Sequence, residues 1–278
     1  MEMSDLPRAA AEAGFVRRAS VAGRFYPADP ATLEQMVRRF MCEASPSPWG
    51  APRALIAPHA GYVCSGIVAG AGFRALSVAA QAKHTVYLMG PAHWLPVYGV
   101  GLSSASAFTT PLGAVPVLTE QVRALAGRGR PYSLTDAAHA PEHCLEVELP
   151  FIQTALPGCR IVPMLFDDAA KPEQIAADLG EWLASDPHSI IVVSSDLSHY
   201  LPYAQAQQAD RSFLDAVAAG DVAAAAKGQA CGLQPILCLM AIARQLGWTA
   251  HVLDYRNSGD TCGPRNEVVG YGSVIFIP

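Results

Sequence analysis

The sequence has little charge and lacks the features that mark nucleic-acid-binding, secreted or membrane-spanning chains. Asp, Glu, Lys and Arg make up only 15% of the 278 residues, and the net charge at pH 7 is −5. The basic pairs Arg17-Arg18 and Arg38-Arg39 are too short to track a phosphate backbone. No apolar run reaches the roughly 18–20 residues that span a bilayer, and the N-terminus lacks the apolar stretch of a secretory signal. These absences predict a cytoplasmic protein with neither a nucleic-acid nor a membrane partner.

The cysteines also lack a recognisable pattern. There are seven, an odd number, and no CxxC pair occurs. A disulfide framework is therefore not expected in a cytoplasmic chain of this size. Each thiol is then either a small buried side chain or a reactive group.

What the sequence does contain is a regular alternation of apolar strands and amphipathic helices. Helices are predicted at residues 30–43, 63–76, 172–184, 204–226 and 235–246. Strands are predicted at 54–57, 85–89, 190–193, 251–260 and 267–278, with an antiparallel excursion inside 100–118. Continuous apolar strands are typical of sheets covered on both faces. We therefore expect an α/β fold with a central mixed, largely parallel sheet flanked by helices, in one domain over 1–278. Residues 1–17 are expected to form a loose N-terminal segment.

Histidines follow three of the predicted strands. His59 comes after the first strand in APHAGY, His93 after the second in GPAHW, and His199 after the third in SSDLSHY. Ligands of open α/β sheets bind at the carboxyl ends of the strands, so these side chains are expected to meet. One histidine in such a place is more often a structural hydrogen-bonding residue, but three with the same placement indicate a site. Asp196 lies in the His199 loop, where it either orients a site residue or caps a helix.

A fourth histidine, His143, stands among acidic residues in the segment EHCLEVELPF. On a helix, Glu142 and Glu146 share one face, as do His143 and Glu146. Two interpretations are open for this segment. It is either a solvated acidic helix face or part of a functional cleft.

Seven segments together resemble a known family. They are VAGRFYPAD, APHAGYVCSG, GPAHW, EHCLEVELPF, VSSDLSHY, CGLQPI and DYRNSGD. Their order from Arg18 to Ile277 resembles that of the Memo (mediator of cell motility) family, whose bacterial members are called AmmeMemoRadiSam system protein B. The resemblance implies a fold similar to class III extradiol dioxygenases. Those enzymes hold non-haem Fe(II) with two histidines and a carboxylate.

The resemblance also implies roles for individual residues. They are the metal ligands His59, His93 and Cys231, the acid/base His199 with its neighbour Asp196, and the pocket residues Tyr62, His143 and Glu146. Cys231 takes the place of the dioxygenase carboxylate. The implied cofactor is one metal ion, with Fe(II) or Cu favoured and Zn as a further candidate, because imidazole and thiolate suit all three.

Three functions are compatible with this set of residues. The first is redox or O2-dependent chemistry on an unidentified small molecule, and the second is a non-catalytic adaptor whose cleft binds a peptide or protein. The third is a metal-dependent hydrolase that uses a metal-bound water. The family name of the bacterial members further implies a functional link with AMMECR1-like and radical SAM proteins.

Overall fold

The computed structural model describes residues 14–80, 82 and 84–278. Most of the segment expected to be loose, residues 1–13, lies outside the described residues. The rest of it is not loose, because Val16–Arg17 form strand β1 and pair in parallel with β5 (Ala107–Thr110). Together with β6 (Gly113–Pro116), these strands make a small three-stranded sheet.

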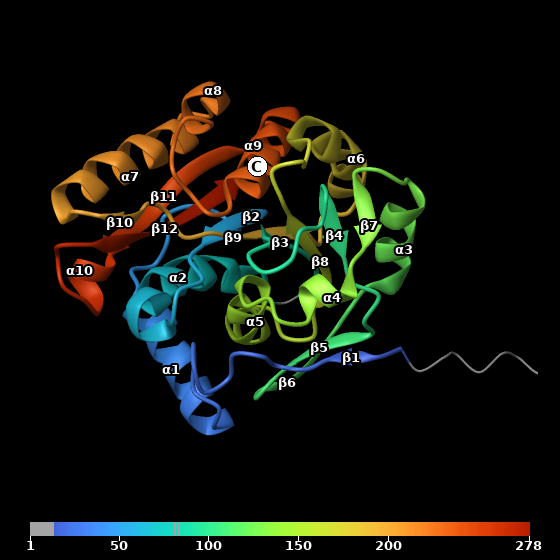
Figure 1. Cartoon of the computed structure of the whole chain (residues 1–278), viewed down its shortest axis with the longest axis horizontal. Helices are drawn as coiled ribbons and strands as arrows, with labels where there is room; N and C mark the ends of the chain where they lie inside the picture. The colour runs from blue at the N-terminus through green and yellow to red at the C-terminus, as the bar shows by residue number, and fades with distance from the viewer. Residues whose placement is uncertain (1–13, 81, 83) are drawn as a thin grey trace, which may run out of the picture.

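Nine strands form the main sheet in the described part of the chain (Figure 1). Their order is β10-β12-β2-β9-β3-β8-β4-β7, and β11, outside this order, pairs with β12. The strands are β2 (Ala54–Ala57), β3 (Thr85–Pro91), β4 (Val100–Leu102), β7 (Tyr132–Leu134), β8 (Arg160–Phe166), β9 (Ser189–Ser194), β10 (His199–Leu201), β11 (Thr249–Asn257) and β12 (Val268–Ile277).

The centre of this sheet is parallel and buried. Strands β2, β9, β3 and β8 run in the same direction, whereas β12 and β4 join on either side as antiparallel strands. Every residue of β2, β3 and β9 is buried. The expected mixed α/β fold is confirmed, and the parallel strands place their carboxyl ends along one edge.

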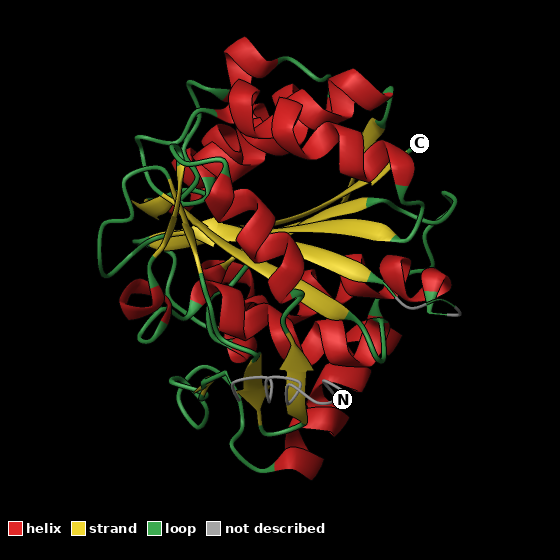
Figure 2. Cartoon of the chain, turned by 90° about the vertical axis from the view of Figure 1, so that its right-hand side faces the viewer, coloured by secondary structure: helices red, strands yellow, loops and turns green. Residues whose placement is uncertain are grey.

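Helices cover both faces of the sheet (Figure 2). On one face lie α1 (Pro30–Glu43), α2 (Tyr62–Leu76) and α5 (Cys144–Ala155), and on the other α6 (Pro172–Ser185), α7 (Tyr203–Ala218) and α9 (Leu233–Leu246). Shorter helices are η1 (Ser77–Ala79), α3 (Thr119–Gly127), α4 (Asp136–His139), α8 (Val222–Ala225) and α10 (Ser258–Thr261). The first predicted helix begins and ends at the residues of α1.

Several secondary-structure elements differ from the predictions. The strand expected over 251–260 ends at Asn257, where α10 follows. The helix expected over 204–226 is broken into α7 and α8, because Gly220 takes a left-handed φ of 69°. Asp221 then begins the second helix by accepting a hydrogen bond from the Ala224 N–H at 2.9 Å. Strand β8 was not predicted, and Pro163 in its middle is the reason, since proline disfavours central strands. It is tolerated because β4 pairs only with Met164–Phe166.

The expectation of no disulfide is also corrected. Cys64 in α2 and Cys262 after α10 are disulfide-bonded across 198 residues of sequence. Such a separation gives no spacing signal in the sequence.

Helix α2 and the η1 turn that continues it form one helical stretch, Tyr62–Ala79. By length and composition this stretch could cross a membrane, but 61% of it is buried inside the fold, as in a core helix.

Helices α1 and α2 approach each other closely at Gly70. A Cβ atom on Gly70 would lie 2.6 Å from the main-chain carbonyl of Phe40, which cannot move without displacing α1. Gly70→Ala is therefore expected to lower the free energy of unfolding by about 1–3 kcal/mol, although alanine normally favours a helix. The measurement is urea unfolding. Gly127→Ala is the control, because Gly127 faces open space in α3, and equal effects of both substitutions would contradict the prediction.

Candidate functional site

Three parallel strands deliver polar residues to one edge of the sheet. Strand β2 ends two residues before His59, β3 ends two residues before His93, and β9 ends at Ser194. Because β2 and β3 both pair in parallel with β9, their following loops converge. The rings of His59 and His93 accordingly lie 5.2 Å apart, nearly perpendicular to each other. The predicted meeting of two strand-end histidines is thus present in the structure.

Cys231 reaches the same place from the turn that precedes α9. Its Sγ atom lies 3.4 Å from His59 Nε2, and the donor atoms of His59, His93 and Cys231 all lie within 4.8 Å of one another. A tetrahedral ion bound at ordinary Zn–N and Zn–S lengths would separate the two ligand atoms by about 3.5 Å. The His59–Cys231 distance therefore fits a shared metal ion without rearrangement.

The turn that carries Cys231 is fastened to the end of β9. The main-chain N–H of Cys231 donates to the Asp196 carbonyl at 3.1 Å, and the N–H of Gly232 donates to Ser195 Oγ at 2.9 Å. A Cβ atom at Gly232 would lie 2.6 Å from that of Ser195, so only glycine permits this approach. Burial raises the pKa of the Cys231 thiol to about 12. The thiol is therefore protonated at neutral pH until a metal ion displaces its proton.

His59 is buried and neutral. Only 2% of its surface is exposed, and burial, reinforced by His93 and His143, lowers its pKa well below 6.5. Its Nδ1 atom lies 2.8 Å from Ser194 Oγ. The imidazole thus meets one requirement of a metal ligand, which is a ring nitrogen free of charge.

His93 is oriented by Glu142, a residue of the EHCLEVELPF segment. The carboxylate of Glu142 accepts from His93 Nδ1 at 2.9 Å and from the His93 main-chain N–H at 2.7 Å. Burial acts to raise the pKa of Glu142, but the hydrogen bonds from His143 and His93 hold it well below 4.5. An ionised carboxylate behind a histidine is a recurrent partner of metal ligands. Sequence reasoning had noted Glu142 only as part of a possible acidic face.

Asp196 and His199 do not bond to each other among the described contacts. Asp196 Oδ1 accepts from the main-chain N–H groups of His59 at 2.8 Å and Ala60 at 3.3 Å, and burial raises its pKa to about 6. Of the two expected roles, Asp196 therefore orients the loop of a candidate ligand. His199 is exposed, with Nδ1 at 2.8 Å from the Leu197 carbonyl.

The three residues expected to line the pocket separate into two groups. The ring of His143 lies 4.8 Å from that of His93 and 5.4 Å from that of His59, so His143 belongs to the site. Tyr62 is 1% exposed and donates to the Val147 carbonyl in the core. Glu146 is fully buried and turned toward the N-terminal segment. Its carboxylate is occupied by Arg17, Ser20, Val21 and Tyr26. The placement of Tyr62 and Glu146 at the pocket is thus corrected.

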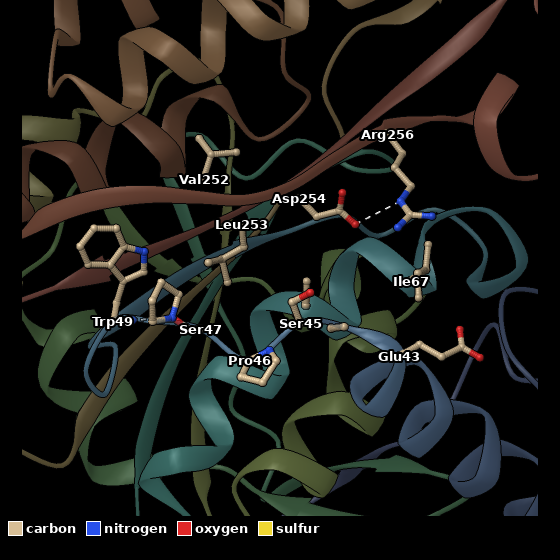
Figure 3. A pocket seen from close by; sticks show the side chains of 13 residues that line it. Glu43, Ser45, Pro46, Ser47, Trp49, Ile67, Val252, Leu253, Asp254 and Arg256 are labelled. Carbon is tan, nitrogen blue, oxygen red and sulfur yellow. Dashed lines mark hydrogen bonds and ion pairs between the residues drawn. The ribbon is translucent and has the colours of Figure 1, made fainter.

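A pocket of about 370 Å³ lies elsewhere on the molecule, between residues 43–49, α2 and β11 (Figure 3). Trp49 stands at one end, its ring stacked on His251 at 3.7 Å, and Asp254 and Arg256 form an ion pair at 3.1 Å on β11. None of the candidate site residues lines this pocket. The candidate site is therefore identified by its converging donor atoms and is separate from this pocket.

Fold and site together define an α/β protein that gathers histidine and cysteine side chains at the carboxyl ends of parallel strands. The chain belongs to the Memo-like protein family, whose family model matches residues 17–275.

Relatives match over nearly their full length. A MEMO1 family protein of Methanopyrus kandleri is 32% identical over 282 residues, covering 94% of this chain and 98% of the relative. One from Methanothermobacter thermautotrophicus is 34% identical, covering 92% and 98%. One from Aquifex aeolicus is 32% identical, covering 94% and 99%. An uncharacterized Escherichia coli K12 protein shares the fold, with a TM-score of 0.51 and 14% identity over 81% of this chain and 99% of that chain.

Proposed function

We propose that this protein holds one metal ion between His59, His93 and Cys231 and uses it in redox or O2-dependent chemistry on an unidentified substrate, in a pocket like that of the extradiol dioxygenases. The observation that carries the proposal is the convergence of the three donor atoms within 4.8 Å at the strand ends. Two imidazoles and a thiolate suit Fe(II), Cu and Zn. Three protein ligands leave a position open on the ion, which is where a metal of this kind supplies its chemistry.

The surroundings of the ligands support this function. Glu142 turns His93 so that Nδ1 faces the carboxylate and Nε2 is left for an ion. Asp196 and the turn at Cys231–Gly232 bind the other two ligands to the end of β9. The site is therefore built by main-chain hydrogen bonds as well as by side chains, which holds the donors in place before an ion arrives.

His199 is the candidate acid/base of this proposal. A carbonyl oxygen only accepts hydrogen bonds, so the 2.8 Å contact with Leu197 requires the proton on His199 Nδ1. Nε2 is then free to take up a proton. His199 follows Asp196 by three residues beyond the end of β9, and Asp196 in turn accepts from the His59 main-chain N–H, which supports this role.

Metal analysis of protein purified without added metal tests the binding half of the proposal. Wild-type protein is expected to carry one ion per chain, and His59→Ala and Cys231→Ser are expected to lose it. His188→Ala and Cys42→Ser are matched controls, because both residues are exposed. His188 precedes β9, at the end of the strand away from Ser194, and Cys42 lies in the last turn of α1. Unchanged metal content in His59→Ala would contradict the proposal.

Oxygen uptake with catechols and related reductants tests the chemical half. His199→Ala is expected to keep the ion but to lose turnover by about 10²–10⁴-fold, the usual contribution of a general acid or base. Ester or amide cleavage that proceeds without oxygen would instead favour a hydrolase. A protein that binds metal but turns over nothing would favour the adaptor function.

A further inference from the structure

A fully buried carboxyl group stands two hydrogen bonds away from His59. Glu148 on α5 is 0% exposed, and its Oε1 atom lies 2.9 Å from Ser194 Oγ, which in turn contacts His59 Nδ1. We propose that Glu148 is a positioning residue which, as a neutral carboxylic acid acting through Ser194, holds His59 with its proton on Nδ1. This inference rests on the proposed function, in which His59 is a metal ligand.

The argument begins with the protons around Ser194. Its hydroxyl oxygen contacts His59 Nδ1 at 2.8 Å, the Cys144 carbonyl at 2.7 Å and Glu148 Oε1 at 2.9 Å. Each of the three contacts needs one proton, and a hydroxyl supplies one while accepting two. The carbonyl supplies none, so the Ser194 proton points to Cys144. His59 and Glu148 must therefore supply the other two protons.

The surroundings of Glu148 agree with a bound proton. In the described part of the chain no cation pairs with its carboxyl group, and Oε2 has no hydrogen-bond partner. A lone ionised carboxylate in such a place is strongly disfavoured. Glu142 and Glu146 on the same segment differ, since each is surrounded by donors. The segment Glu142–Glu148 thus presents two ionised carboxylates and one neutral acid.

The proton count has a consequence for the metal ligand. With the proton on Nδ1, the lone pair of His59 lies on Nε2, the atom 3.4 Å from Cys231 Sγ. Glu148 and the Cys144 carbonyl together anchor Ser194 Oγ. Without Glu148, Oγ loses one of these anchors and can leave the carbonyl to turn its proton toward Nδ1, so that the ring carries its own proton on Nε2, where it blocks an ion. His93 is hydrogen-bonded to the Glu142 anion, whereas His59 is hydrogen-bonded to the uncharged pair of Ser194 and Glu148. The two ligands therefore differ in basicity.

Infrared spectroscopy of the metal-free protein tests the proton on Glu148. Wild-type protein at pH 7.5 is expected to show the carbonyl band of a protonated carboxylic acid, which Glu148→Gln removes. Glu120→Gln, at an exposed glutamate, is expected to leave the band unchanged. Absence of the band from wild type, or its persistence in Glu148→Gln, would overturn the inference.

Long-range ¹H–¹⁵N NMR of ¹⁵N-histidine-labelled, metal-free protein tests the position of the His59 proton. Wild type and Glu148→Gln are expected to show Nδ1–H, because the glutamine amide replaces the acid as donor. Glu148→Met and Ser194→Ala are expected to show a mixture with Nε2–H. An unchanged tautomer in both of these variants would contradict the positioning role.

Zn(II) competition titrations then connect the tautomer with binding. Glu148→Met and Ser194→Ala are expected to bind about 10–100-fold more weakly than wild type, as for other residues behind metal ligands, while Glu148→Gln retains the wild-type affinity. Equal losses in Glu148→Gln and Glu148→Met would refute a neutral donor. A wild type that binds no metal would overturn the proposed function alone, since the infrared and NMR results need no metal.

Discussion

Replacing Arg17 by methionine is expected to lower the free energy of unfolding by about 3–5 kcal/mol, the usual effect of removing one partner from a buried ion pair. Arg17 and Glu146 are both buried, and the carboxylate of Glu146 also accepts from Ser20, Val21 and Tyr26. Burial acts to raise the pKa of Glu146, but Arg17 and these donors hold it below its ordinary value. Without Arg17, the carboxylate remains in the core without its cation.

Denaturant unfolding at pH 7 measures this effect. Arg18→Met is the matched control, because Arg18 is the next residue and is exposed, and it is expected to change stability by no more than about 0.5 kcal/mol. The double substitution Arg17→Met and Glu146→Gln removes the charge as well and is expected to recover part of the loss. If Arg17→Met and Arg18→Met behave alike, the buried pair does not anchor the N-terminal segment.

The second large effect is a change in the pH dependence of stability when Glu148 is replaced by glutamine. Burial raises the pKa of Glu148 well above 4.5 in the folded protein, so between these two pKa values the folded state holds a proton that the unfolded state has released. Stability therefore falls as pH rises through this window, by about 1.4 kcal/mol per pH unit. Glutamine cannot ionise and removes this slope.

Unfolding curves between pH 5 and pH 8 measure the difference between wild type and Glu148→Gln. The variant is expected to be the more stable at pH 8, with the gap closing toward pH 5. Glu146→Gln provides the comparison, since the depressed pKa of Glu146 keeps it ionised in both the folded and the unfolded state above pH 5, so this variant is expected to lose the same stability across the whole range. Parallel curves for wild type and Glu148→Gln would show that Glu148 is ionised in the folded protein.

Much of the fold follows from local sequence signals. Helix α1 was predicted at its observed bounds because Asp29 caps it, Pro30 occupies its first turn and Leu33, Val37 and Phe40 recur on its buried face. Strand β2 was predicted for its short apolar run, which stops at Pro58. Long-range features gave no such signal. The disulfide joins Cys64 to Cys262 only because the fold brings α2 beside the end of α10.

The candidate site was predictable in part for the same reason. His59 and His93 were predictable because each lies two residues after an apolar strand, and the carboxyl ends of parallel strands lie at one edge of the sheet. Cys231 lies in a turn with no such marker, and only the family resemblance nominated it. Ser194 and Glu148 were missed as partners of His59, since their contact depends on how α5 packs against β9. A glutamate inside the apolar run EVELPF was the one available hint.

The place of β2 in the sheet sets the order in which the site is completed during synthesis. Strand β2 lies between β9 and β12, so the strand that leads to His59 lacks one neighbour until Val268–Ile277 have been synthesised. Cys231 is likewise made long after His59 and His93. The three donor atoms therefore cannot come together before Cys231 has left the ribosome, so any ion held between them is acquired after that point of synthesis.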